Sequence, residues 1–324
     1  MKYEISRRQI LVASAAVAAS VVAMPTVAQS SWKPNRTVKL VVPYPPGGSI
    51  DILARLVAPG LSDLLGQPVI VENKGGATGT IGTGFVYSAP ADGTILLVGV
   101  SDALSIYPHL TKTAYDAMKF VPVANIGSSA LALVGRPGLK VHTLQELISL
   151  ARKQPLTFAN AGAGGIIHVM TLAFGRAAGI DDMVHVPFQG GAPARQAVMS
   201  DQVDLFFSIV AGASQYRSRL KYFGVSSAQR VAEIADVPTF AEQGLPLVRE
   251  LWSGVLAPPN TPPEVSSAIA KAIEEVVARD SYKTKLKELG MDVALMKQHE
   301  FASYYADEHR KWGEVIRATN VKLN

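Results

Sequence analysis

Two glycine-rich loops give this chain its clearest capacity to bind an anion. The first, residues 44–51, reads YPPGGSID and directly follows the apolar run 38–42, so a helix that begins near Ser49 would present unpaired backbone N–H groups at its positive end. The second, residues 160–168, reads NAGAGGIIH and repeats this arrangement. Helix starts of this kind suit a carboxylate. Because ligand sites of open α/β domains lie beyond the carboxyl ends of strands and between domains, we predict that the two loops face each other across a cleft.

Both loops also have a purely structural interpretation. Gly47 and Gly48 could serve only a tight turn, with Ser49 or Asp51 capping the helix that follows. His168, just inside the second helix, could donate to an anion or bond to nearby backbone, and we favour the backbone bond slightly. The presence of two similar loops is what favours a binding function over these alternatives.

A third glycine-rich stretch, residues 73–82, reads NKGGATGTIG and matches neither the P-loop spacing nor the dinucleotide-binding fingerprint. We expect it to form a tight turn and a helix start beside the first loop, with Thr78 or Thr80 available as a hydroxyl donor. Nucleotide binding is therefore not expected.

Enzymatic and metal-binding motifs are scarce. Ser101 lies in the segment GVSDA, which fails the G-x-S-x-G pattern because Ala103 replaces the second glycine. We interpret Ser101 and Ser208, each at the end of a predicted strand, as hydrogen-bond donors to a ligand, and Asp204 as a structurally paired carboxylate. Without cysteine, an H-E-x-x-H motif or an acidic cluster at ligand spacing, the sequence predicts no catalytic residue, no metal and no cofactor.

The elements that position these loops alternate along the chain from residue 37, short β-rich runs being followed by amphipathic stretches, which is typical of sheets covered by helices. Strands are predicted at 38–42, 69–71, 95–98, 131–134, 156–159, 183–186, 203–207, 222–225 and 251–257. Helices are predicted at 50–65, 144–152, 168–178, 193–199, 263–279, 282–289 and 300–319. A kink or break is expected in the first helix at Pro59-Gly60.

The last strand and the three helices after it have no second sheet of their own to cover, so we expect them to return to the first domain. The predicted fold class is α/β, with two domains, a hinge and an interdomain ligand cleft. Domain 1 is expected to be discontinuous, from residues 29–124 plus 251–324, and domain 2 to be inserted at 125–250. Two crossings between domains act as a hinge.

The first 28 residues have the features of a twin-arginine signal peptide. Arg7 and Arg8 lie in S-R-R-x-hydrophobic-Leu, followed by an uncharged run at 12–23 and a small-residue end that predicts cleavage near Ala28. The apolar run is well short of the ~20 residues of a spanning helix, which leaves a retained anchor as the minority alternative. Because the chain has no cysteine, we expect export to the periplasm without a lipid anchor or disulfide.

The charge of the chain is compatible with an anionic ligand but does not demand one. Lys2, Arg7 and Arg8 less Glu4 account for +2 of the net charge of +5, which leaves +3 on residues 29–324. Lys and Arg are scattered, without a basic stripe interleaved with aromatic residues, so no nucleic-acid partner is expected. We expect a monomer.

At the level of whole segments, the chain resembles the Bug family, the periplasmic receptors of tripartite tricarboxylate transporters. The segments that carry this resemblance, in order, are VVPYPPGGSIDILARL, LGQPVIVENKGGATGTIG, ADGTILLVG, FANAGAGGIIH, VPFQGGAPARQAVMSDQVDLFF and VLAPPNTPPEV. They run from Val38 to about Leu289, so the resemblance is far more specific than any single glycine loop. It implies a two-domain periplasmic binding protein fold of type II-like form, whose α/β domains close on a small carboxylate or similar solute and deliver it to membrane permease subunits.

The resemblance implies that the first loop holds a carboxylate through Gly47, Gly48, Ser49 and Asp51, and the second through residues 162–165 and His168, chiefly by backbone N–H groups and ordered waters. The full set of candidate ligand-binding residues is Tyr44, Gly47, Gly48, Ser49, Asp51, Thr78, Ser101, Gly162, Ala163, Gly164, Gly165, His168, Gln189 and Ser208.

Two departures from the family's usual wording bear on the ligand. Gln189 stands in FQGG where relatives commonly have YKGG, and Ser208 ends FFS where they commonly have MFD. Loss of an acid at Ser208 argues against an amino-acid ligand, whose ammonium would need that partner. We therefore expect an aliphatic or aromatic carboxylic acid without an ammonium group. The alternatives are a ligand sensor for a membrane signalling partner and, less favoured, a periplasmic hydrolase.

Overall fold

The structure is a computed structural model that describes residues 32–160, 164–180, 182–188 and 190–319. The expected signal peptide and the candidate residues Gly162, Ala163 and Gln189 lie outside these ranges. No helix within them has both the length and the apolar character needed to cross a membrane.

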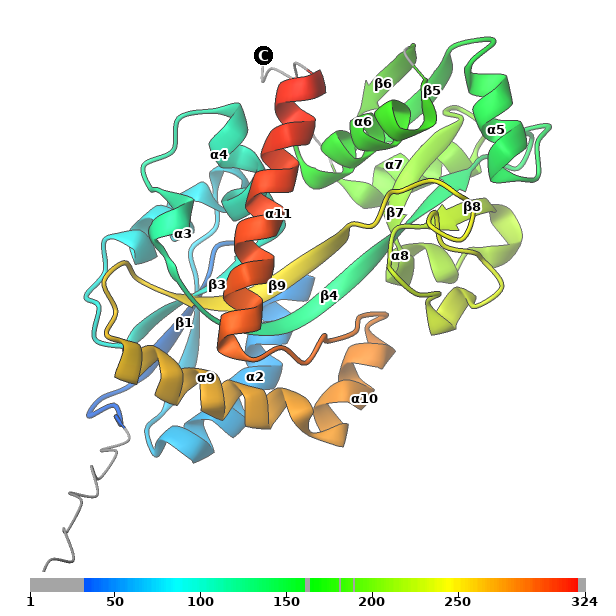
Figure 1. The fold of residues 1–324 in the computed structure, drawn as a ribbon. Coiled ribbons are helices and arrows are strands. Elements are labelled where there is room, and N and C mark those ends of the chain that lie inside the picture. The colour runs from blue at the N-terminus through cyan, green and yellow to red at the C-terminus, as the bar shows by residue number, and fades with distance from the viewer. Residues whose placement is uncertain (1–31, 161–163, 181, 189, 320–324) are drawn as a thin grey trace, which may run out of the picture. The chain divides into compact units, whose positions relative to one another are not determined.

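Nine strands of the described chain form a curled mixed sheet in the order β2-β1-β3-β9-β4-β7-β5-β6, with β8 paired to β4 beside this path (Figure 1). The strands are β1 (Val38–Val42), β2 (Val69–Asn73), β3 (Ile95–Val100), β4 (Val121–Gly135), β5 (Leu156–Asn160), β6 (Met183–Pro187), β7 (Leu205–Ile209), β8 (Lys221–Val225) and β9 (Glu250–Ala257). We refer to β2, β1, β3, β9 and the beginning of β4 as the first half of the sheet, and to the end of β4 with β7, β5, β6 and β8 as the second half.

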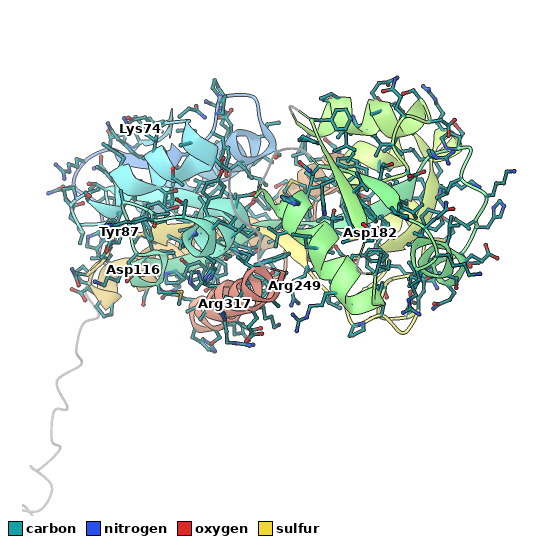
Figure 2. The ribbon with its side chains drawn as sticks, turned by 90° about the horizontal axis from the view of Figure 1, so that it is seen from above. Lys74, Tyr87, Asp116, Asp182, Arg249 and Arg317 are labelled. Carbon is teal, nitrogen blue, oxygen red and sulfur yellow. The ribbon has the colours of Figure 1, made fainter. Side chains whose placement is uncertain are left out.

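Helices connect most of the parallel strands, as the alternating pattern predicts. They are α2 (Ser49–Leu65), α3 (Thr80–Tyr87), α4 (Tyr107–Leu110), α5 (Leu144–Ala151), α6 (Ile166–Ala178), α7 (Gly191–Met199), α8 (Val210–Ser214), α9 (Pro263–Ala278), α10 (Asp280–Glu288) and α11 (Gln298–Thr319). Short 3-10 helices are η1 (Ala77–Gly79), η3 (Ala117–Lys119), η4 (Arg217–Arg219) and η5 (Ala232–Ile234), and η2 (Asp102–Ile106) is a π-helix. In Figure 2, Lys74 and Tyr87 lie on the first half and Asp182 on the second.

The two halves are joined by β4, which runs through both, and by the return of the chain from β8 into β9, which pairs antiparallel with β4; we call β4 and β9 the crossing strands. Residues 121–130 of β4 pair with β9, from Val121 opposite Ala257 to Ala130 opposite Glu250, while residues 131–135 pair with β7 and β8. The prediction of a strand at 131–134 was therefore too short. The missed part reads VPVANIGSSA, in which small and polar residues replace the β-branched run that marks a strand.

Two aromatic clusters form the cores of the halves. In the first, Trp252 packs edge-on against Phe301 and Tyr305, with ring centroids 5.8 and 5.5 Å away. The second contains six buried phenylalanines together with Trp312, which is fully buried. Because Phe301, Tyr305 and Trp312 all come from α11, this one helix contributes to both cores.

Helix α2 runs unbroken through Pro59 and Gly60, so the expected break is absent. Gly60 instead serves packing, because a Cβ at this position would lie 2.8 Å from Cγ2 of Val276. The close approach lets α9 pack against α2, and the helical tail thereby covers the first half.

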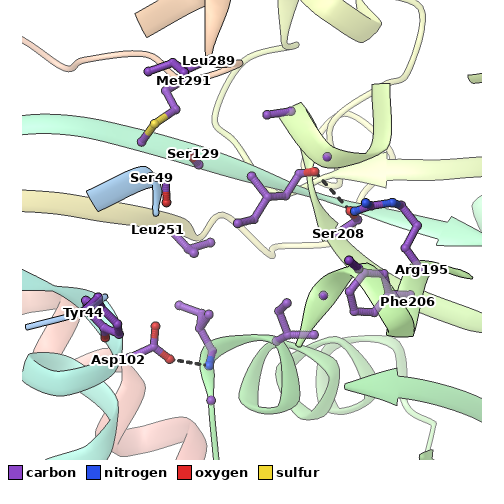
Figure 3. Close-up of a pocket in the computed structure, with 18 of the residues that line it drawn as sticks. Tyr44, Ser49, Asp102, Ser129, Arg195, Phe206, Ser208, Leu251, Leu289 and Met291 are labelled. Carbon is purple, nitrogen blue, oxygen red and sulfur yellow. Dashed lines mark hydrogen bonds between the residues drawn. The ribbon is translucent and has the colours of Figure 1, made fainter. Parts of the chain in front are cut away.

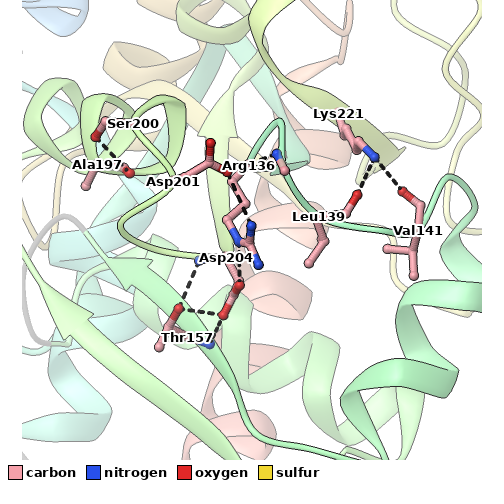
Figure 4. Close-up of polar contacts among 10 residues, drawn as sticks. Arg136, Leu139, Val141, Thr157, Ala197, Ser200, Asp201, Asp204 and Lys221 are labelled. Atoms are coloured by element: carbon pink, nitrogen blue, oxygen red, sulfur yellow. Dashed lines mark hydrogen bonds and ion pairs between the residues drawn. The ribbon is translucent and has the colours of Figure 1, made fainter.

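The prediction that Asp204 is a structural carboxylate is confirmed. Its Oδ1 pairs with Nε of Arg136 at 2.8 Å, and its Oδ2 accepts from the backbone N–H and hydroxyl of Thr157 at 2.9 and 2.7 Å (Figure 4). Burial raises the pKa of the Asp204 carboxyl, but these contacts outweigh it and the net pKa is lowered. Asp204 therefore ties the end of β4 to β5.

Candidate functional site

A cavity of about 560 Å³ lies between the loops of the first half and those of the second (Figure 3). Tyr44, Ser49 and Asp102 line it on one side, and Arg195, Phe206 and Ser208 on the other. The crossing strands contribute Ser129 and Leu251, and the segment after α10 contributes Met291. A neighbouring cavity of about 390 Å³ shares Tyr44, Ser49, Asp102 and Leu251 with the first. Both volumes lie within the range of small-molecule sites.

The structure brings about half of the candidate residues together. Those that line one or both cavities are Tyr44, Gly48, Ser49, Thr78, Ser101, Gly165 and Ser208. Gly47, Asp51, Gly164 and His168 are described but are not among the residues that line either cavity. Each of these four belongs to a loop that contributes a lining neighbour.

In the first loop, Asp51 holds the turn in place. It is almost fully buried, and its carboxylate accepts from Gly47 N–H at 2.9 Å, Arg55 Nε at 2.9 Å and Asn73 Nδ2 at 3.0 Å. The hydrogen bond from Arg55, followed by those from Gly47 and Asn73, lowers the pKa of Asp51 to about 2 against the effect of burial. Since Gly47 has φ +83°, the turn also requires a residue that tolerates left-handed backbone.

The start of α2 is open to the cavities. Its N-cap, Gly48, supplies no side-chain capping bond, and Ser49 as the first helical residue lines both cavities. The backbone N–H groups of a first helical turn have no partner within the helix and lie at its positive end. This position is therefore suited to an anionic group.

At the start of α6 in the second half, a carboxyl group of the chain already occupies the helix start. The carboxylate of Asp102, in η2 of the first half, accepts the N–H of Ile166 at 2.8 Å (Figure 3). Burial raises the pKa of Asp102, and the net pKa stays raised although hydrogen bonds from Ile166 N–H and its own backbone N–H lower it. The N-cap of α6, Gly165, supplies no side-chain capping bond of its own. Asp102 thus demonstrates that this helix start accepts a carboxylate, and it links the two halves across the cavity.

His168 makes the backbone bond that we favoured. Its Nδ1 accepts the N–H of Gly164 at 3.1 Å, and Gly164 has φ +73°. The ring centroid lies 4.6 Å from that of His185. Burial, and secondarily the neighbouring His185, lower the pKa of His168 to about 4. His168 is therefore neutral at pH 7 and acts as an acceptor that holds the glycine loop.

This arrangement predicts acid sensitivity. Because the ordinary pKa of 6.5 falls to about 4 on folding, the unfolded chain binds a proton more readily, so stability is complete above about pH 6.5 and is lost as the pH falls towards 4. Discounted for the partial exposure of the ring, the loss at His168 between pH 7.5 and 5 is ~1 kcal/mol in the free energy of unfolding. His168→Gln keeps an acceptor that does not titrate, so urea denaturation of this variant should show a smaller loss than the native protein. Equal losses would contradict this role.

Sequence reasoning missed two lining residues that carry charge. Asp102 was noticed only as a neighbour of Ser101, and Arg195 only as part of an amphipathic helix. They are the only charged residues among the described residues that line the larger cavity. Neither had a local signal, because their positions depend on how strands distant in sequence are paired. Within the described ranges, no group of three or more His, Asp or Glu side chains is placed to hold a metal.

The comparisons with known proteins agree with this geometry. The family described as "Tripartite tricarboxylate transporter family receptor" matches residues 53–321. Protein BugT of Bordetella pertussis strain Tohama I is 32% identical over 331 residues, which cover 97% of this chain and 96% of that protein. The structure of periplasmic binding protein BugD is similar with a TM-score of 0.72 and 29% identity, covering 90% of this chain and 100% of BugD. MatC from Rhodopseudomonas palustris, solved with bound malate, has a TM-score of 0.71 and 30% identity, covering 87% of this chain and 99% of MatC.

The fold prediction is confirmed, since these structural neighbours are two-domain solute-binding proteins of similar length. The family match extends over most of the chain, and it is supported by relatives aligned almost end to end. The chain therefore belongs to the family of tripartite tricarboxylate transporter receptors, which are periplasmic solute-binding proteins.

Proposed function

We propose that this protein is a receptor that captures a small carboxylic acid between the two halves and delivers it to the permease of a tripartite tricarboxylate transporter, without catalysis. The observation that carries the proposal is the contact between Asp102 and the N–H of Ile166 at 2.8 Å, because it places a carboxylate on a helix start that faces the cavity. The open start of α2 at Ser49 offers a second position of the same kind. Malate bound to the related MatC supports this class of ligand.

The domain organisation is part of the same proposal. Residues 29–124 plus 251–324 would form one domain and 125–250 the other, with β4 and β9 as the two hinge crossings. Both proposed boundaries fall within or at the end of these paired strands. Closure would then bend a two-stranded ribbon and would be favoured by a ligand that contacts both domains.

We also propose that the chain is exported as a monomer through the twin-arginine route, with residues 1–28 removed. The mass of the periplasmic protein tests the cleavage site. Undiminished export after Arg7→Lys and Arg8→Lys together would contradict the twin-arginine route.

The binding function is tested by a thermal-shift screen of residues 29–324 against mono-, di- and tricarboxylic acids, aliphatic and aromatic. A ligand at 100 times its Kd should add about 2.7 kcal/mol to the free energy of unfolding. If the acid is recovered chemically unchanged after long incubation with the protein, the result agrees with binding without turnover. Ser49→Ala should weaken binding of that acid by ~0.5–1.5 kcal/mol, the value of one hydrogen bond. Ser303→Ala, on the exposed side of α11, is the matched control and should have no effect. A screen in which no acid stabilises the protein would refute the proposal.

A further inference from the structure

Arg195 is the one basic residue among the described residues that line the larger cavity. It comes from α7 and faces the wall formed by Tyr44 and Asp102 from the opposite side of the cavity (Figure 3). None of the ion pairs among the described residues includes Arg195, although many other arginines of the chain are paired. Its Nε is buried and has no hydrogen-bond partner in the described part of the chain. The side chain as a whole is partly exposed, so the guanidinium is open to a partner from the cavity, while a buried N–H without an acceptor is unfavourable.

The surroundings of Arg195 hold its guanidinium in one place. The carbon Cζ lies 5.0 Å from the centre of the Tyr216 ring, a distance typical of a cation–π contact. On another side it approaches the backbone of α8, where a Cβ on Gly212 would lie 2.9 Å from Nη1. The same Cβ would lie 3.7 Å from Oγ of Ser208, so the serine hydroxyl and the guanidinium occupy neighbouring positions on this wall. A planar group fixed in this way is prepared to bind a carboxylate through two parallel hydrogen bonds.

The cavity that Arg195 and Ser49 share is lined elsewhere largely by apolar side chains. Phe206, Ile209, Leu251 and Met291 line the same cavity. They offer no partner for a charged group, but they suit a hydrocarbon chain or ring. The cavity therefore has a position for an anion on each wall, and much of its remaining lining is apolar.

We propose that Arg195 is a specificity-determining residue that binds a second anionic group of the ligand, so that the receptor selects acids with two separated anionic groups over monocarboxylic acids. One carboxylate would occupy the start of α2 at Ser49, and the other would pair with Arg195 beside Ser208. This inference rests on the proposed receptor function and adds the class of acid.

The test compares acids that differ only in the second carboxylate, namely adipate with hexanoate, succinate with butanoate, and terephthalate with benzoate. Calorimetry is performed on residues 29–324 of the native protein, on Arg195→Met, and on the control Arg219→Met, whose side chain is exposed in η4. At least one diacid should bind the native protein tenfold or more tightly than its monoacid partner. In Arg195→Met this difference should disappear, because the affinity for the diacid should fall at least tenfold and that for the monoacid less than twofold. Arg219→Met should preserve the difference.

A second variant guards against loss of folding in the first. Gly212→Ala keeps the positive charge but crowds Nη1, so it should also reduce the preference for the diacid while circular dichroism stays native. If acids bind the native protein but Arg195→Met binds the diacid as tightly, or if only monoacids bind, the role of Arg195 is refuted and the receptor function stands. If no acid in the screen binds the native protein, the receptor function itself fails.

Discussion

A chain that comprises residues 29–249 should not fold. Strand β9 lies between β3 and β4, so its removal leaves the first half of the sheet without the strand that connects it to β4. The truncation also removes Trp252, Phe301 and Tyr305, the buried centre of the first core. Because the removed apolar burial far exceeds the usual 5–15 kcal/mol of net stability, the remainder should lack a cooperative unfolding transition.

The measurement is urea denaturation followed by circular dichroism, with residues 29–324 as the control. The intact chain should unfold in one or two cooperative steps, whereas the truncated chain should change gradually and be degraded rapidly by protease. A truncated chain that unfolds cooperatively and binds the ligand of the intact protein would show that the first half folds without the tail.

Phe301→Ala should lower the free energy of unfolding by ~3–5 kcal/mol, the cost of emptying a fully buried aromatic site. Phe301 lies on α11 against Trp252 of β9, so the variant loosens the contact between the last helix and the crossing strand. Phe301→Leu, which leaves a smaller cavity, is the matched control and should cost less than half as much.

Gly254 provides a second test of the same contact, because a Cβ at this position would collide with Cζ of Phe301. Gly254→Ala alone should therefore destabilise the protein by ~1–3 kcal/mol through overpacking. In the double variant the new methyl group enters the space that Phe301 leaves. The loss in the free energy of unfolding of the double variant should therefore be at least ~1 kcal/mol smaller than the sum of the two single losses. Simple additivity, measured by denaturant unfolding, would show that the two positions do not share this contact.

The fold could be predicted where burial gives a periodic local signal. Strands β1 and β9 were placed within one residue because their apolar runs are bounded by turn residues. The beginning of β4 was missed because it is buried by neighbouring elements rather than by an apolar run of its own. Small and polar side chains such as Asn125 and Ser128 are therefore buried there and give no strand signal in the sequence. The π-helix η2 was also missed, because an added residue in a turn has no signature in composition.

The site could be predicted only as far as its backbone. Glycine loops at helix starts identify themselves in sequence, and Gly48, Ser49 and Gly165 do line the cavities. Asp102 and Arg195 could not be found in this way, because the residues that they contact, Ile166 and Tyr216, lie more than ten positions away in the chain. Prediction of charged lining residues requires the strand order, which local periodicity does not contain.

The position of Trp252 on a crossing strand has a practical consequence. Its ring lies in the first core, its residue lines the smaller cavity, and its backbone N–H donates to Oγ of Ser101 at 3.2 Å. The chain has only three tryptophans, so Trp252 accounts for a large share of the tryptophan fluorescence of the protein. In the closure proposed above, the two halves would rotate about β4 and β9, which would alter the environment of this ring. Its fluorescence should therefore follow ligand titration and the rate of closure in an unlabelled protein, with Trp312→Phe removing most of the background.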